Sequence, residues 1–202
     1  MTIKILIADD HPSFRRVLGT VLSDTPDLEV IGEASNGQEA IEKIGELKPD
    51  VVLMDLRMPE INGVKATAAI REKFPEVKVI VLTLFDEADD LFNAVKAGAK
   101  GYLLKSVELD GLVASIRYIA SGEVIVPPVM ASRILNDFKS GSRRRSPVEA
   151  VTLTDREKQV LQLVAQGLKE PEVAAKVSIT EADVRTDLRN ALEKFQRKYQ
   201  GK

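Results

Sequence analysis

Residues 50–59 read DVVLMDLRMP, a short apolar run followed by an acid, an arginine and a proline. Four consecutive apolar residues between polar ones are typical of a strand that is buried on both faces of a sheet. Asp55 then stands where that strand should end. The same arrangement recurs before and after this stretch, so it decides how the first part of the chain is interpreted.

The first 122 residues alternate five strand-like runs with five amphipathic segments. The runs are 4–8, 28–34, 51–54, 77–83 and 101–104, and the segments lie near 13–24, 37–47, 63–74, 86–98 and 108–121. This alternation predicts parallel strands that are joined by right-handed crossovers. We therefore expect an α/β fold with a doubly wound five-stranded parallel sheet of the flavodoxin-like kind, which binds ligands beyond the carboxyl ends of its strands.

The pattern changes after Gly122. Residues 123–148 are predicted to be a linker with a short helix near 129–139, because the stretch SGSRRRSP is small, polar and basic. Residues 149–202 carry helical patterns alone. Thr154 and Thr180 each precede an acidic residue three positions later, which predicts two capped helix starts. Two helices joined by a short turn predict a smaller all-α helix-turn-helix domain.

Composition narrows the class of protein. Of the 202 residues, 44% are hydrophobic and 30% are charged, and the absence of cysteine excludes disulfides and thiolate metal sites. Neither a secretory signal nor an apolar run of membrane length is seen, so we expect a cytoplasmic protein with no membrane partner. Residues 147–202 hold 10 Lys+Arg against 9 Asp+Glu, which predicts weak nonspecific binding to DNA.

Acidic side chains follow two strands that should be neighbours. Asp9 and Asp10 follow the run KILIA, and Asp55 follows VVLM. In a sheet of order 2-1-3-4-5 the first and third strands lie side by side, so the three carboxylates should share one crevice. Such a crevice suits Mg²⁺ and an aspartate that accepts a phosphoryl group. Lys105 and Thr83, at two further strand ends, are suited to phosphoryl oxygens.

The stretches ADDH, VVLMDLRMPEINGV, VIVLT and GAKGYLLKS, in this order, resemble the signatures of response-regulator receiver domains. The resemblance implies that Asp55 is the phosphoacceptor and that a sensor histidine kinase is the phosphoryl donor. It also implies a switch pair and a metal site. The switch pair would be Thr83 and Tyr102, Lys105 would contact the phosphoryl group, and the ligands of Mg²⁺ would be Asp9, Asp10, Asp55 and the backbone carbonyl of Arg57.

Residues 153–195 resemble a DNA-binding domain of the LuxR type. A receiver followed by such a domain is the arrangement of NarL/FixJ-type response regulators, so the resemblance implies control of transcription at promoter DNA by a protein that dimerises through its receiver when phosphorylated. On the last helix several polar residues lie opposite an apolar stripe, and arginine and asparagine can read bases. The expected DNA contacts are Arg185, Thr186, Arg189, Asn190, Arg197 and Lys198.

Two departures from the family pattern leave a second function open. Asp187 stands where the family usually has histidine, and an acid facing DNA would repel phosphates. We also expect the family's usual fourth helix to be missing from residues 149–202. The helical domain would then contact a protein instead of DNA, in a phosphorylation-switched binding module. A phosphatase with an aspartyl-phosphate intermediate is disfavoured, because Arg57 stands where such enzymes commonly have a second aspartate.

Overall fold

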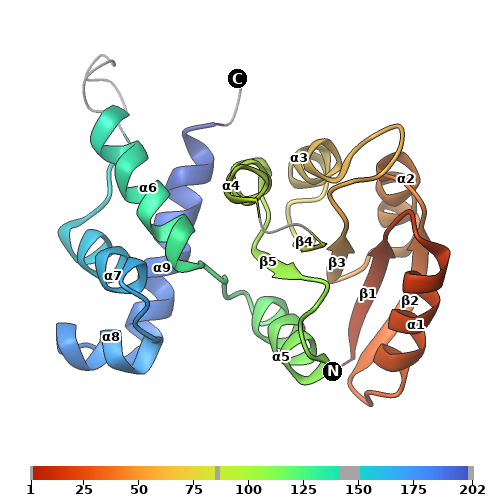
Figure 1. Ribbon diagram of the computed structural model, residues 1–202, viewed down its shortest axis with the longest axis horizontal. Helices are drawn as coiled ribbons and strands as arrows, with labels where there is room; N and C mark the ends of the chain where they lie inside the picture. Colours follow the sequence, from red (N-terminus) through yellow and green to blue (C-terminus); the bar gives the residue numbers. More distant parts are fainter. Residues whose placement is uncertain (1, 85–86, 142–150, 200–202) are drawn as a thin grey trace. The chain divides into compact units, whose positions relative to one another are not determined.

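The structure, a computed structural model, describes residues 2–84, 87–141 and 151–199. The chain divides into two compact units, Met1–Gly122 and Glu123–Lys202 (Figure 1). Among the described residues, none of the helices combines the length and the apolar character that a membrane span requires.

The first unit is built on a five-stranded parallel sheet with the strand order β2-β1-β3-β4-β5. The strands are β1 (Ile3–Ala8), β2 (Leu28–Ala34), β3 (Val51–Met54), β4 (Lys78–Thr83) and β5 (Gly101–Leu104). All four residues of β3 are buried, as expected of a central strand that is covered on both faces. The predicted doubly wound sheet and its strand order are confirmed.

Five helices cover the two faces of this sheet. Figure 1 shows α1 (Pro12–Ser23) and α5 (Leu109–Ala120) on one face, and α2 (Gly37–Leu47), α3 (Gly63–Lys73) and α4 (Ala88–Ala97) on the other. The core beneath α2 and α3 includes Leu6, Met54, Ile44 and Ile70, each 1% exposed or less. The helix start that the sequence predicts at residue 86 lies outside the described residues.

The register of the sheet brings the polar strand ends to one edge. Ala8 pairs with Met54, and Thr83 pairs with Leu104. The next residues continue both ladders. The backbone N–H of Asp55 donates to the Ala8 carbonyl at 2.8 Å, and that of Lys105 donates to the Thr83 carbonyl at 2.8 Å. Residues 9, 55, 83 and 105 therefore meet at the carboxyl edge of the sheet.

The start of α2 shows how local chemistry fixes a helix near this edge. The Asn36 side chain accepts from the Glu39 backbone N–H at 2.9 Å. In return, the Glu39 carboxylate accepts from the backbone N–H and the hydroxyl of Ser35, both at 2.7 Å. Lys43 lies 2.7 Å from the other Glu39 oxygen. Lys43 first, and then the Ser35 donors, lower the pKa of Glu39 to about 2.

We expect Glu39→Gln to destabilise the protein in a pH-dependent way. Because the pKa is lower in the folded protein, the ionised carboxylate stabilises the fold above pH 4.5, and this contribution is lost as the pH falls towards 2. The cost near pH 7 should be about 1 kcal/mol, since solvent screens the contact with Lys43. Urea unfolding at pH 7, 4 and 3 measures it. A difference between variant and parent that is equal at all three pH values would contradict this assignment.

The second unit holds α6 (Pro128–Gly141), α7 (Asp155–Ala165), α8 (Glu170–Val177) and α9 (Glu181–Arg197) among its described residues. The predicted caps are confirmed, because Thr154 and Thr180 each accept from a backbone N–H three residues later. The sequence assigned 123–148 to a linker. Of that segment, α6 packs against α7 and α9, and residues 142–148 lie outside the described residues.

Candidate functional site

An acidic pocket lies at the carboxyl edge of the sheet. Asp9 and Asp10 follow β1, and Asp55 follows β3. One oxygen from each of these acids and a ring nitrogen of His11 all lie within 4.8 Å of one another. Asp9 is 2% exposed and Asp55 is 5% exposed. The three carboxylates that the sequence predicts to meet do meet, and two of them are buried.

The Lys105 ammonium group enters the same pocket from the end of β5. Its Nζ lies 2.5 Å from Asp9 Oδ2 and 3.2 Å from Asp55 Oδ2, and its side chain is 4% exposed. The Phe14 ring, from α1, lies 4.6 Å from this nitrogen and covers it. Sequence reasoning missed Phe14, because an apolar residue on an amphipathic helix gives no signal for contact with a cation.

Burial dominates the titration of Asp55. Desolvation raises the pKa of its carboxyl, the Lys105 charge opposes that rise, and the neighbouring Asp9 charge adds to it. The ionised form is held by donors as well, since the Leu56 backbone N–H donates to Asp55 Oδ1 at 2.8 Å. Asp55 is therefore a desolvated carboxylate. Because few water molecules can hydrate its oxygens, they are more reactive as nucleophiles than those of an exposed acid.

The donor set of the pocket fits a divalent cation. Three carboxylates against one ammonium leave two negative charges in excess, and oxygen ligands are those that Mg²⁺ prefers. Asp10 Oδ1 is buried and accepts no hydrogen bond from the residues that the structure describes. His11 Nδ1 lies 2.7 Å from it but is an ion-pair partner only when the imidazole is protonated. This oxygen is therefore available to a metal ion.

The remaining predicted receiver residues lie on β4, on β5 and in the loop after β3. Thr83 is fully buried at the end of β4, and Tyr102 on β5 is 7% exposed. The Arg57 guanidinium turns to α4, where its Nη2 lies 3.0 Å from Glu87 and 3.6 Å from Asp90. Arg57 thus links the loop after β3 to the start of α4 through these ion pairs. The sequence position of Arg57 did not predict this contact.

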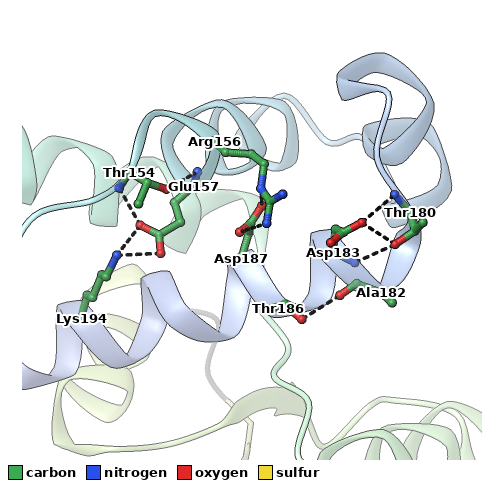
Figure 2. Close-up of polar contacts among 9 residues, drawn as sticks. All are labelled: Thr154, Arg156, Glu157, Thr180, Ala182, Asp183, Thr186, Asp187 and Lys194. Carbon is green, nitrogen blue, oxygen red and sulfur yellow. Dashed lines mark hydrogen bonds and ion pairs between the residues drawn. The ribbon is translucent and has the colours of Figure 1, made fainter.

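The predicted DNA-contacting residues lie along α9 in the second unit. Arg185, Thr186, Arg189 and Asn190 are partly exposed, and Arg197 is exposed near the end of the helix. The Thr186 hydroxyl donates to the Ala182 carbonyl at 2.9 Å (Figure 2). Lys198, just beyond α9, is bound to Asp137 of α6. Arg185, Arg189 and Arg197 have acidic neighbours as well.

Asp187 corrects an expectation. The sequence suggested an acid that would face DNA, but Asp187 is 4% exposed and turns inward to the Arg156 guanidinium. Arg156 donates to its two oxygens at 2.7 and 3.1 Å (Figure 2). Glu157, which follows Arg156 on α7, makes a second ion pair with α9, because it accepts from Lys194 at 2.8 Å. The first turn of α7 therefore holds α9 at two points, Asp187 and Lys194, which are seven residues apart.

Comparisons with known proteins agree with this division. Residues 5–117 match the family model described as response regulator receiver domain, and residues 151–199 match that of the bacterial regulatory proteins of the luxR family. The transcriptional regulatory protein LnrK of Bacillus subtilis is 40% identical, over 96% of this chain and 90% of that protein. The response regulator VraR of Staphylococcus aureus is 37% identical, over 97% and 91% respectively.

A solved structure matches the chain over both of its units. The response regulator ChrA of a heme-sensing two-component system, known from a crystal structure, is 31% identical in sequence. The two structures superpose with a TM-score of 0.56, over 98% of this chain and 97% of the ChrA chain. The helical domain of the present chain matches the luxR family of bacterial regulatory proteins, and a relative over most of the chain is named a transcriptional regulatory protein, which disfavours a module that contacts only a protein. The chain belongs to the NarL/FixJ-type response regulators, signalling proteins that regulate transcription, in which a receiver domain precedes a LuxR-type helix-turn-helix domain.

Proposed function

We propose that Asp55 accepts a phosphoryl group from a phosphohistidine of a sensor kinase in the cytoplasm, and that this event controls binding of α9 to promoter DNA. The observation that carries the proposal is the buried Asp55 carboxylate, 3.2 Å from the Lys105 ammonium and beside two further acids. In the transfer, an Asp55 oxygen bonds to phosphorus as the bond from phosphorus to the donor's imidazole nitrogen breaks.

The chain's own residues prepare this transfer. Lys105 is held between Asp9 and Asp55. Its ammonium group could therefore pair with an oxygen of the incoming phosphoryl group without leaving the pocket. The Thr83 hydroxyl would donate to a second oxygen. Asp9, Asp10, Asp55 and the Arg57 carbonyl would hold Mg²⁺, which when bound neutralises the acids and the phosphoryl charge. The same pocket would later admit water for hydrolysis of the acyl phosphate.

Release of Lys105 from Asp55, and movement of Thr83 towards the phosphoryl group, would couple the pocket to the rest of the receiver. Tyr102 is buried on β5, which pairs with the strand that ends at Thr83, and as the second member of the switch pair its ring would move together with Thr83. Such a two-state change alters the receiver surface and favours a homodimer. Two copies of α9 would then bind DNA together, which compensates for the low positive charge of each domain.

The DNA-contacting face is tested with Arg189→Ala. We expect about tenfold weaker binding to a selected promoter fragment, the range for loss of one arginine contact to a base. Phosphorylation by acetyl phosphate should be unchanged, because α9 belongs to the other unit. Fluorescence anisotropy measures the affinity, and Lys158→Ala on α7 is a control with the same loss of charge. If both variants bind DNA as the parent does, α9 does not present Arg189 to DNA.

A further inference from the structure

The arginine that begins the predicted DNA face is held by two carboxylates. Arg185 Nε donates to Glu170 Oε2 at 2.9 Å, and Arg185 Nη2 donates to Glu181 Oε2 at 3.2 Å. Glu181 is one turn earlier on α9, whereas Glu170 is the first residue of α8. The guanidinium is therefore fixed between the two helices of the helix-turn-helix by an acid from each of them.

A second arginine of the same face also has an acidic neighbour. Arg189 Nη1 lies 3.7 Å from Glu123 Oε2. This Glu123 oxygen is buried and has no hydrogen-bond partner within residues 2–84, 87–141 and 151–199. Both residues belong to the second unit. Acidic neighbours therefore occur along the face and are not peculiar to Arg185.

These ion pairs compete directly with DNA. Glu170 and Glu181 occupy the Nε and Nη2 edge of the Arg185 guanidinium. If Arg185 turns this edge to a phosphate or a guanine, it must give up the carboxylates, which then lie close to phosphates and repel them. The Glu181 contact is an ordinary pair one helical turn apart and is easily lost. The Glu170 contact is shorter, at 2.9 Å against 3.2 Å, and solvent screens it less, because the Glu170 side chain is 27% exposed and that of Glu181 is 48% exposed. Glu170 is thus the stronger competitor for Arg185.

We propose that Glu170 limits the affinity of this domain for DNA, by holding Arg185 until a backbone phosphate displaces it. The inference rests on the proposed contact between Arg185 and DNA, and it adds a residue that sets the strength of that contact. It also gives a physical reason for the weak binding that we expect of one copy of the domain, since the local charge is neutralised within the helix-turn-helix itself.

The test uses the full-length protein and Glu170→Gln, which keeps the side-chain size and removes the charge. The probe is a labelled duplex of mixed sequence, of roughly 20 base pairs or two helical turns, titrated at several salt concentrations. We expect about tenfold tighter binding at low salt and a salt slope that is steeper by about one, because one more cation then contacts phosphate. Circular dichroism checks that the helices are retained.

A matched control separates this effect from a general change of charge. Asp155→Asn removes the same negative charge from the same unit, at an exposed residue that pairs with Lys158 on α7. It should leave the salt slope unchanged. The double variant with Arg185→Ala should gain nothing from Glu170→Gln. An equal gain in the Asp155→Asn control, or in the absence of Arg185, would overturn the proposal.

The proposal and the function on which it rests fail in different ways. If Arg185→Ala weakens binding while Glu170→Gln binds like the parent, the DNA contact stands and Glu170 does not limit it. If Arg185→Ala binds DNA as tightly as the parent, Arg185 is not a contact, and both are wrong. If Glu170→Gln weakens binding, Glu170 positions Arg185 for DNA instead of holding it back, and the proposal is again overturned.

Discussion

Asp55→Asn should reduce the uptake of phosphate from acetyl phosphate to background. The amide of asparagine is not a nucleophile, and the neighbouring acids are poorly placed to replace it. Asp9 is buried, but Lys105 lies closer to it than to Asp55, at 2.5 against 3.2 Å, and the His11 backbone N–H donates to it at 3.0 Å. Asp10 is more exposed than Asp55, so its carboxylate is less desolvated. The substituted amide side chain keeps the volume of the original carboxylate, so the fold should remain intact.

The measurement is the intact mass of the protein after incubation with acetyl phosphate and Mg²⁺. Asp27→Asn is the matched control, because Asp27 is a surface acid of the same unit that pairs with Arg117 at 2.6 Å. This control should be labelled like the parent. Labelling of Asp55→Asn to the same stoichiometry would show that another side chain is the phosphoacceptor, and the proposed mechanism would be abandoned.

Gly63→Ala should be among the most destabilising single substitutions in the receiver. A Cβ at Gly63 would lie 2.0 Å from the Asp55 carbonyl oxygen and 2.9 Å from the Leu56 Cα. Both are backbone atoms, so a side-chain rotation cannot relieve the clash. Gly63 also donates its N–H to the Leu56 carbonyl at 3.0 Å. The substitution must therefore push apart the start of α3 and the residues that carry the phosphoacceptor.

We expect a cost of about 3 kcal/mol, the upper range for overpacking, together with slower phosphorylation of Asp55. Urea unfolding and the rate of labelling are the two measurements. Gly45→Ala on α2 is the control, because its nearest neighbour is the Phe74 ring at 3.5 Å. There the new methyl group should stabilise the helix by about 1 kcal/mol. Equal stability of the two variants would mean that the loop after β3 can move aside at little cost.

The sequence predicted the receiver pocket well because its information is local. Each of its residues ends a strand, and a parallel sheet of known order brings strand ends together whatever the details of packing. Asp9, Asp55 and Lys105 could therefore be placed from their spacing and from the apolar runs before them. The strand bounds followed from the same runs, and the helix caps from Thr154 and Thr180.

The helix-turn-helix was harder to predict because its decisive contacts join residues distant in sequence. The position of Asp187 on one helix suggests an acid that faces DNA, but its surroundings depend on Arg156, which is 31 residues earlier. In the same way, the sequence shows Glu170 only as an acid near a helix start, and its pairing with Arg185 follows from how α8 crosses α9. The helical period shows on which face of its helix a side chain lies, but it does not identify the residue of another helix that the side chain contacts.

The packing of α6 has a consequence for dissecting the protein. Met130 and Ile134 are fully buried, and Asp137 accepts from Lys198 at the end of α9 and from the Tyr199 hydroxyl at 2.5 Å. A recombinant fragment that begins at residue 149, where the sequence predicts the helix-turn-helix domain to start, would omit this helix and leave part of the apolar surface of α7 in contact with water. Fragments designed for binding studies or for crystallisation should therefore begin at Glu123.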